Sequence, residues 1–351
     1  MFDVTIIGAG VVGNAIAREL CRYKLNICVV EKDSDVGNGT SKANSGIVHA
    51  GFDAEPNTLK SKLNLIGNSM FDNLSKELDF TFKKVGSLVL CFNKAEVKNL
   101  EKLKQQGIEN GVPDLEIIGG DKVREVEPNI SKNVVAALYA PTGGIVCPYE
   151  MTIALAENAA VNGVKFKLNT RVISLKKSKE FYIIETNREN IETKLIINAA
   201  GIESPGLTSS PAIAEMVRDI VVSKLKPEKN DKFNPIRKEI PKFREMTNEE
   251  RKRMIASNPK YGKIIYRCET VTEGEILDAI RRPLGARTMD AVKKRTRSGM
   301  GRCQSGFCSP RVVEILTREL KISPQEVTKF GNHSNILVGK DKQSSWHQME
   351  F

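Results

Sequence analysis

The sequence predicts a mixed α/β protein that ends in a small helical module. Two observations carry this prediction. Short apolar runs without charges, such as Val4–Ile7, are typical of buried parallel strands, and they alternate with stretches of helical spacing such as Asn14–Tyr23. In the last quarter of the chain, short helical stretches surround three cysteines, Cys268, Cys303 and Cys308. At roughly 150 residues per domain, the 351 residues suffice for about two domains.

The composition excludes several classes of protein. Hydrophobic residues make up 40% of the chain, which rules out a largely disordered polypeptide. No apolar run approaches the roughly 18 residues that a transmembrane helix needs, so contact with a membrane could only be peripheral. The first residues lack the basic stretch of a secretory signal, and seven cysteines without such a signal indicate reduced thiols. We therefore expect a cytoplasmic protein.

The net charge of +11 raises the question of nucleic-acid binding. Much of the excess lies after residue 220, where lysine and arginine are frequent. Aromatic residues form only 6% of the chain and do not alternate with the basic residues, as they do on surfaces that stack bases. We expect no nucleic-acid partner and interpret the basic region as a solvated face or a dock for an acidic protein.

A glycine motif directly follows the first apolar run. Gly8, Gly10 and Gly13 form G-x-G-x-x-G between a predicted strand and a predicted helix, and Glu31 follows the next apolar run. Gly8 permits a tight turn, Gly10 lets a pyrophosphate approach the backbone, and Gly13 lets the helix lie against the strand. The helix N-terminus attracts phosphate, and a carboxylate at Glu31 accepts hydrogen bonds from ribose hydroxyls. The motif predicts a Rossmann-like dinucleotide-binding domain; the alternative is a glycine turn without a ligand.

A stretch rich in glycine and hydroxyl side chains, residues 32–51, follows the motif. It resembles the flavin-contacting segment of FAD-dependent oxidoreductases of the glycine-oxidase and D-amino-acid-oxidase superfamily. Within that superfamily it is most similar to the branch with anaerobic glycerol-3-phosphate dehydrogenase and L-2-hydroxyglutarate oxidase. Residues 140–148 and 198–214 resemble further segments of the same family. The resemblance implies FAD as the cofactor. Beyond the glycine motif and Glu31, it implies contacts to FAD from Lys32, Thr40, Ser41, Asn44, Ser45, Gly46, Val172, Ala200, Gly201, Gly206, Leu207 and Thr208.

The resemblance also implies how the chain is divided. The expected segments are a Rossmann-like FAD-binding domain (1–65 and 141–223), a partial α+β substrate domain (66–140), a linker (224–262), the cysteine module (263–325) and a tail (326–351). In the family a long segment separates the motif at Asn198–Gly201 from the one at Ile202–Ala214, whereas here the two adjoin. The sequence therefore predicts that an internal segment is missing at about residue 201, and with it much of the substrate domain.

His49 is the candidate catalytic residue. It lies between the Ser45-Gly46 turn and Gly51, and in the resembling family this histidine is near the flavin and the substrate. An imidazole exchanges protons near neutral pH, so His49 could take the hydroxyl proton as hydride leaves the substrate carbon. The alternative is that His49 only forms hydrogen bonds to the flavin or to its own loop. The other histidines, His333 and His347, are expected on the surface of the tail.

The activity is implied by the resemblance. It suggests an FAD-dependent dehydrogenase or oxidase of a small anionic hydroxy compound, with glycerol-3-phosphate and L-2-hydroxyglutarate as the leading substrates. The arginines that would hold the anion are expected in the missing segment. The alternative is a truncated, non-catalytic protein that binds flavin or docks a redox partner.

The cysteine module resembles the bacterioferritin-associated-ferredoxin-like [2Fe-2S] domain. There the ligands follow the order Cys-x-Cys and Cys-x4-Cys, and Cys268, Cys303 and Cys308 match three of the four positions. Tyr266 stands at the first position, so the implied metal site has one unusual or missing ligand; the alternative is a module without a cluster. If the cluster forms, electrons would leave through it toward a partner flavoprotein. Ser309, as N-cap before Pro310, predicts the start of a helix.

Overall fold

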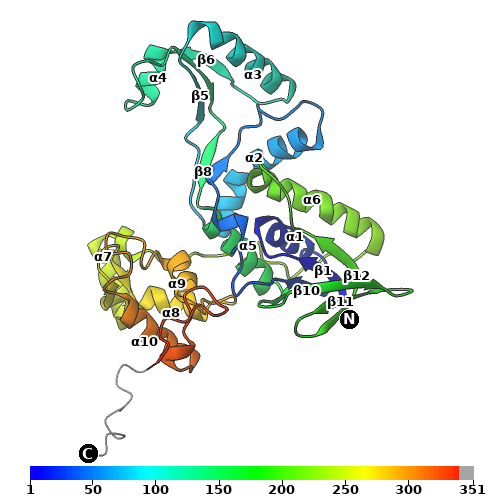
Figure 1. Cartoon of the computed structure of the whole chain (residues 1–351), viewed down its shortest axis with the longest axis vertical. Coiled ribbons are helices and arrows are strands. Elements are labelled where there is room, and N and C mark those ends of the chain that lie inside the picture. The colour runs from blue at the N-terminus through cyan, green and yellow to red at the C-terminus, as the bar shows by residue number, and fades with distance from the viewer. Residues whose placement is uncertain (340–351) are drawn as a thin grey trace, which may run out of the picture. The chain divides into compact units, whose positions relative to one another are not determined.

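The computed structural model describes residues 1–339, which form two compact units (Figure 1). The larger unit contains Met1–Glu31 and Val36–Lys238. The smaller unit contains Lys32–Asp35 and the described residues from Glu239 onward. Each unit has its own apolar core, so each is considered by itself.

A six-stranded sheet forms the centre of the larger unit, in the order β10-β11-β12-β1-β2-β9. The strands are β1 (Phe2–Ile7), β2 (Ile27–Val30), β9 (Lys165–Lys167), β10 (Val172–Lys177), β11 (Tyr182–Thr186) and β12 (Asn190–Asn198). Those from β12 to β9 are parallel, and β10 and β11 are antiparallel neighbours at one edge. All residues of β2 are buried, as its apolar sequence predicts. The α/β domain predicted from the sequence is confirmed.

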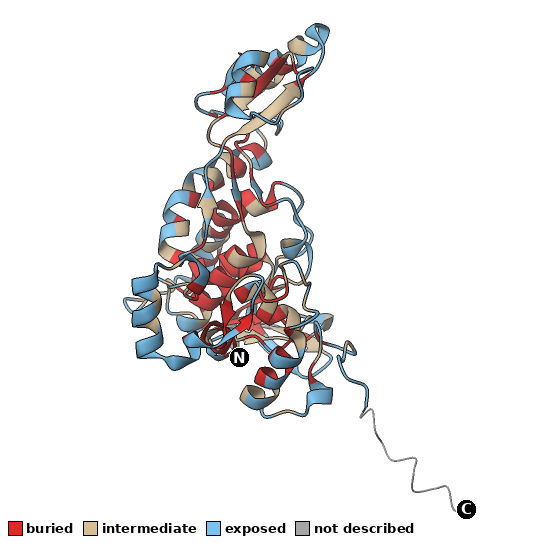
Figure 2. Cartoon of the chain, turned by 90° about the vertical axis from the view of Figure 1, so that its left-hand side faces the viewer, coloured by how far each residue is buried: buried red, intermediate tan, exposed pale blue. Residues whose placement is uncertain are grey.

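Helix α1 (Val11–Leu20) packs against this sheet, and it belongs to a group of four helices with α2 (Leu59–Leu78), α5 (Pro148–Val161) and α6 (Gly206–Leu225). Contacts join α1 to α5 and α6, and α2 to α6. All residues of α1 are buried, and Figure 2 shows buried residues gathered in the interior of this unit. The crossing of α2 and α6 is close, because a Cβ on Gly67 would lie 2.1 Å from the carbonyl oxygen of Thr208. This crossing fixes the first turn of α6.

Two smaller sheets complete the larger unit. The first has the order β3-β8-β4, from β3 (Ile47–Val48), β8 (Gly144–Val146) and β4 (Phe82–Lys83). The second is antiparallel, in the order β5-β7-β6, from β5 (Ser87–Cys91), β7 (Ala136–Ala140) and β6 (Glu116–Gly119), and it packs with α3 (Val97–Glu109) and α4 (Gly120–Val126). This sheet and its helices are the small α+β part that the sequence predicted.

The smaller unit is mostly helical. It contains the strand pair β13 (Ile264–Tyr266) and β14 (Val271–Thr272) and the helices α7 (Asn248–Ser257), α8 (Glu273–Arg281), α9 (Met289–Thr296) and α10 (Ser309–Leu320). Capping boxes open α7 and α8. The N-cap of α10 is Cys308, so the prediction of Ser309 as the N-cap was wrong by one residue. The physical reason is that the Ser309 hydroxyl donates to the carbonyl oxygen of Ser305 instead of accepting an N–H bond.

The first residue of α8, Glu273, is fully buried among cationic side chains. Its carboxylate pairs with Lys260 at 3.2 Å, Lys263 at 2.9 Å and Arg318 at 2.7 Å. Burial by itself raises the pKa of Glu273, but the hydrogen bonds and charges of these three partners lower it to about 2. This ion cluster ties α8 to α10 and to the segment before β13.

The segment 224–262, expected to be a linker, is shared by the two units. Residues 224–225 are the last two of α6, and the residues that follow them, up to Lys238, also belong to the larger unit. There Arg237 Nε donates to Glu157 Oε2 at 2.8 Å, and Arg237 also donates to the carbonyl oxygen of Leu78 at 3.0 Å.

The end of the expected tail, including His347, lies outside the described residues. Short 3-10 helices lie at Thr40–Lys42, Lys94–Glu96, Phe243–Glu245, Pro259–Gly262 and Pro324–Glu326.

Candidate functional site

The glycine motif lies where β1 ends and α1 begins. Gly8 has a φ of +102°, a conformation that side chains rarely tolerate. A Cβ on Gly13 would lie 2.0 Å from the carbonyl oxygen of Gly8, so only glycine lets α1 lie this close to the turn. That position is also 3.4 Å from the Cβ of Ala199, whose N–H donates to the carbonyl oxygen of Ile7 at 3.0 Å. The glycine motif and the turn after β12 are therefore neighbours.

A hydroxyl and a carboxylate reach the glycine turn from two other segments. The hydroxyl of Ser41 accepts a hydrogen bond from the N–H of Val11 at 2.9 Å. The carboxylate of Glu31, just after β2, accepts one from the N–H of Ala9 at 2.8 Å. A Cβ on Gly10 would lie 3.1 Å from Ser41 Oγ, so a side chain at this position would press on the hydroxyl that bonds to the helix N-terminus. A bare turn at a helix N-terminus with a carboxylate after the second strand fits the diphosphate and ribose of FAD.

The segment after this turn is held by Asn44. Its Nδ2 donates to the carbonyl oxygen of Thr40 at 3.0 Å, and its Oδ1 accepts from the N–H of Gly46 at 2.9 Å. Gly46 has a φ of +67°, and a Cβ there would lie 2.4 Å from the carbonyl oxygen of Val146. Thr40, Asn44 and Ser45 are exposed in this turn. This turn leads from Ser41, which contacts the N-terminus of α1, to β3, and its side chains are small.

The backbone of His49 is held from two sides, directly after β3. Its N–H donates to Thr208 Oγ1 at 3.0 Å, and its carbonyl oxygen accepts from Asn68 Nδ2 at 3.0 Å. Thr208 is buried in the first turn of α6, and Asn68 lies in the middle of α2. The structure thus brings half-buried His49 to the N-terminus of a helix that begins more than 150 residues later. Sequence reasoning missed Asn68, because a single amide on a helix carries no pattern.

The other residues expected to contact FAD lie at the ends of neighbouring elements. Gly206 and Leu207 open α6, and Ala200 and Gly201 are exposed in the loop before it. Val172 begins β10 and packs against a core cluster that includes Val30 of β2. Lys32 is exposed, and its ammonium pairs with Asp33 at 3.0 Å.

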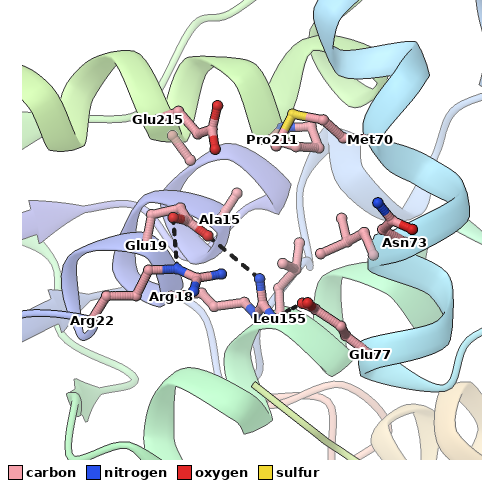
Figure 3. A pocket seen from close by; sticks show the side chains of 12 residues that line it. Ala15, Arg18, Glu19, Arg22, Met70, Asn73, Glu77, Leu155, Pro211 and Glu215 are labelled. Carbon is pink, nitrogen blue, oxygen red and sulfur yellow. Dashed lines mark hydrogen bonds and ion pairs between the residues drawn. The ribbon is translucent and has the colours of Figure 1, made fainter. Parts of the chain in front are cut away.

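A pocket of about 140 Å³ lies elsewhere in the larger unit, among α1, α2, α5 and α6 (Figure 3). Charged side chains line it, and none of the expected site residues does. Arg18, 3% exposed, pairs with Glu19 and Glu77, and Arg22 pairs with Glu19 at 2.8 Å. Arg18 also donates to Asn158 Oδ1 at 3.1 Å. These bonds join α1, α2 and α5, so we interpret the cluster as structural.

The three expected metal ligands of the smaller unit differ in their surroundings. Cys268 is exposed, Cys303 is half-buried and Cys308 is buried. Burial raises the pKa of Cys308. For Cys303, burial also raises the pKa, but hydrogen bonds from two backbone N–H groups and from the side chains of Cys268 and Tyr266 outweigh it, and the pKa is lowered. Within residues 1–339, no group of three histidine, cysteine or acidic side chains is arranged to hold a metal ion.

Comparison with family models decides the family. A model described as FAD dependent oxidoreductase matches residues 3–263. The chain belongs to this family of FAD-dependent oxidoreductases. A second model, described as BFD-like [2Fe-2S] binding domain, matches residues 264–318. The resemblance to an FAD-dependent oxidoreductase with such a carboxyl-terminal domain is thereby confirmed.

Three similar proteins place the chain within the family. The glycerol 3-phosphate dehydrogenase of Caloramator mitchellensis is 40% identical, over 97% of this chain and 99% of its own length. The mitochondrial L-2-hydroxyglutarate dehydrogenase of Nematostella vectensis is 30% identical, over 65% of this chain and 54% of its own. The solved L-alpha-glycerophosphate oxidase of Mycoplasma pneumoniae, with FAD bound, has a TM-score of 0.62 and 21% identity, over 68% of this chain and 98% of its own. The last similarity concerns the fold.

The match to the dehydrogenase also bears on the missing segment. Because it extends over 99% of that relative, it argues against the alternative of a truncated, non-catalytic remnant. The alignment nevertheless has 476 positions, whereas the chain has 351 residues. Well over a hundred positions inside it therefore have no residue of this chain opposite them, as expected for an internal gap.

Among the described residues, no helix is both long and apolar enough to cross a bilayer.

Proposed function

We propose that the chain oxidises the secondary hydroxyl of glycerol 3-phosphate, with FAD as the cofactor. The observation that carries the proposal is the hydrogen bond from the backbone N–H of His49 to Thr208, which holds the backbone of His49 beside the first turn of α6. The substrate is supported by the dehydrogenase relative, which is 40% identical. L-2-hydroxyglutarate is the second candidate, supported by a relative that is 30% identical over a shorter stretch.

The glycine turn and the first turn of α1 bind the diphosphate of FAD, because their N–H groups offer hydrogen bonds and positive potential. Glu31 accepts hydrogen bonds from the adenosine ribose, and the backbone of Val172 faces the adenine. Lys32 begins the next segment. In this proposal that segment runs from the diphosphate toward the flavin ring, and it contains Thr40, Ser41, Asn44, Ser45 and Gly46. The ring is bordered by Ala200, Gly201, Gly206, Leu207 and Thr208.

When bound, FAD supplies the acceptor for the hydride that leaves the substrate carbon. The side chain of His49 accepts the hydroxyl proton, so that a carbonyl group forms. Thr208 and Asn68 act as positioning residues, because they fix the backbone that carries the imidazole. The N-terminus of α6 favours negative charge beside it, and it therefore stabilises electron-rich states at this place. In this proposal His49 therefore carries out the acid–base part of the reaction, and the N-terminus of α6 supplies the electrostatic stabilisation.

The first test is the visible spectrum of the purified chain before and after substrate, without oxygen. We expect a flavin spectrum that glycerol 3-phosphate bleaches and that L-2-hydroxyglutarate bleaches more slowly. A flavin spectrum that neither compound bleaches would show that the proposed activity is wrong although the cofactor binds. A well-folded chain that takes up no FAD would refute the entire proposal.

The second test concerns His49. The variant His49→Gln keeps a hydrogen-bonding side chain but cannot accept the proton to form a cation, so we expect FAD binding to persist and turnover to fall by about 10²–10⁴-fold. His333→Gln is the matched control, because His333 is exposed in the smaller unit. Full turnover of His49→Gln with normal FAD content would exclude a catalytic role. A cytoplasmic location remains part of this proposal, and fractionation of cells with an antibody to the chain tests it.

A further inference from the structure

We propose that the side chain of Tyr266 fills the space that a [2Fe-2S] cluster would need, so that the smaller unit of this chain folds and persists without a cluster. The inference is independent of the proposed oxidation, because it concerns residues 264–318, which match the BFD-like model. A [2Fe-2S] cluster is normally held by four cysteine thiolates. The matched region contains three cysteines, Cys268, Cys303 and Cys308.

Tyr266 points into the group of thiols. It ends β13, its side chain is 1% exposed, and it is the largest of the fully buried side chains in the described part of the chain. Its hydroxyl accepts a hydrogen bond from the N–H of Gly301 and interacts by hydrogen bonds with Cys268 and Cys303. The phenol oxygen therefore lies beside the thiols of two expected ligands, which are themselves neighbours. An iron atom bound by these two sulfurs would have the phenol beside it in place of a further thiolate.

The surrounding backbone is shaped to accept the phenol. A Cβ on Gly301 would lie 2.7 Å from the Tyr266 hydroxyl oxygen and 2.7 Å from the Cβ of Cys268. The absence of a side chain at this position leaves room for the ring beside Cys268. Cys308, the third thiol, is buried in the same apolar core as Tyr266, and the hydroxyl of Ser298 lies 4.0 Å from its sulfur.

The smaller unit also has enough interactions to fold without iron. Its apolar core is continuous from β13 through α8, α9 and α10, and includes Tyr266 itself. The capping box of α8 and the ion cluster around Glu273 fix the same helix from its N-terminus. Small domains that depend on a metal lack such a core and unfold when the metal is removed. Here the tyrosine contributes to the core at the place where a cluster would otherwise stand.

The experiment measures iron and acid-labile sulfide in the full chain after incubation with ferrous iron and sulfide without oxygen. For the unchanged chain we expect no iron or sulfide above the level of a protein without a cluster site. For Tyr266→Cys, which supplies the fourth thiol and removes the ring, we expect about two iron and two sulfide per chain. Tyr266→Phe keeps the ring without the oxygen and is expected to stay free of iron. Tyr266→Cys combined with Cys303→Ser is the matched control, which should lose the gain.

Three results would overturn the inference. The first is an unchanged chain with about two iron and two sulfide, which Tyr266→Phe loses; the tyrosine oxygen would then be a ligand. The second is a cluster of that stoichiometry in both of these proteins. The third is a Tyr266→Cys variant with native circular dichroism and FAD content that gains no cluster, since Tyr266 would then not be the obstacle. If that variant does not fold, the unchanged chain and Tyr266→Phe still decide the question.

Discussion

The substitution Gly13→Ala tests the central feature of the larger unit, which is the contact of α1 with the glycine turn. The added Cβ would lie 2.0 Å from the carbonyl oxygen of Gly8, whereas such contacts are essentially never below 3.0 Å, so α1 and the turn must separate by about 1 Å. Both groups are backbone and cannot rotate away. Overpacking of this kind costs about 3 kcal/mol, and alanine regains about 1 kcal/mol of helix propensity. The net destabilisation of Gly13→Ala is then about 2 kcal/mol.

For a unit of this size, about 2 kcal/mol corresponds to a decrease in Tm of roughly 4–8 °C. We also expect loss of FAD, since the helix N-terminus moves away from the diphosphate position. The assay is thermal unfolding by far-UV circular dichroism, together with FAD per chain. The control is Gly119→Ala, because no atom lies within 4 Å of a Cβ there. If Gly13→Ala retains both the Tm and the FAD of the unchanged chain, α1 does not lie on the glycine turn as described.

Three further predictions concern single contacts. Thr208→Val removes the acceptor of the His49 N–H, so turnover should fall about 10-fold or more while FAD content persists, and Thr208→Ser should restore turnover; equal kinetics of both variants would contradict the positioning role. The pKa of Glu273 is about 2, below its ordinary 4.5, so its ion pairs stabilise the smaller unit above pH 4.5 and this stability is lost as the pH falls toward 2. In acid titrations followed by circular dichroism, Glu273→Gln should be less stable at pH 7 and should lose less between pH 4.5 and 2; an unchanged acid transition would refute this. Arg237→Met removes the ion pair between Arg237 and buried Glu157, so urea unfolding should show a loss of about 3 kcal/mol, and a loss below 1 kcal/mol would contradict the importance of the pair.

The nucleotide half of the fold could be predicted because its signals are local. The strand, turn, helix and second strand that hold Gly8, Gly10, Gly13 and Glu31 occupy the first 31 residues, and each leaves a periodic pattern. The hydrogen bond of Ser41 to the α1 N-terminus had no such signal, because it joins residues 30 positions apart.

The part of the candidate site around His49 was less predictable. The strands of the sheet β3-β8-β4 have two or three residues each, too few for an alternating pattern. The residues that fix His49 come from α2 and α6, and their meeting depends on the close crossing at Gly67. In the smaller unit the spacing of the three cysteines indicated the right domain. Whether the side chain of Tyr266 lies beside them depends on the side-chain packing around Gly301. The spacing of residues along the sequence does not show such packing.

The gap in the alignment and the intact nucleotide half are compatible for a physical reason. The loop from Ala199 to Pro205 joins two elements that are each fixed independently of it. On one side, Ala199 extends the pairing of β12 with β1 and touches the glycine turn. On the other side, the first turn of α6 is fixed by α2 and by the bond between Thr208 and His49. A segment present or absent in this loop therefore leaves the proposed contacts to the diphosphate and the adenosine unchanged and alters what borders the flavin ring.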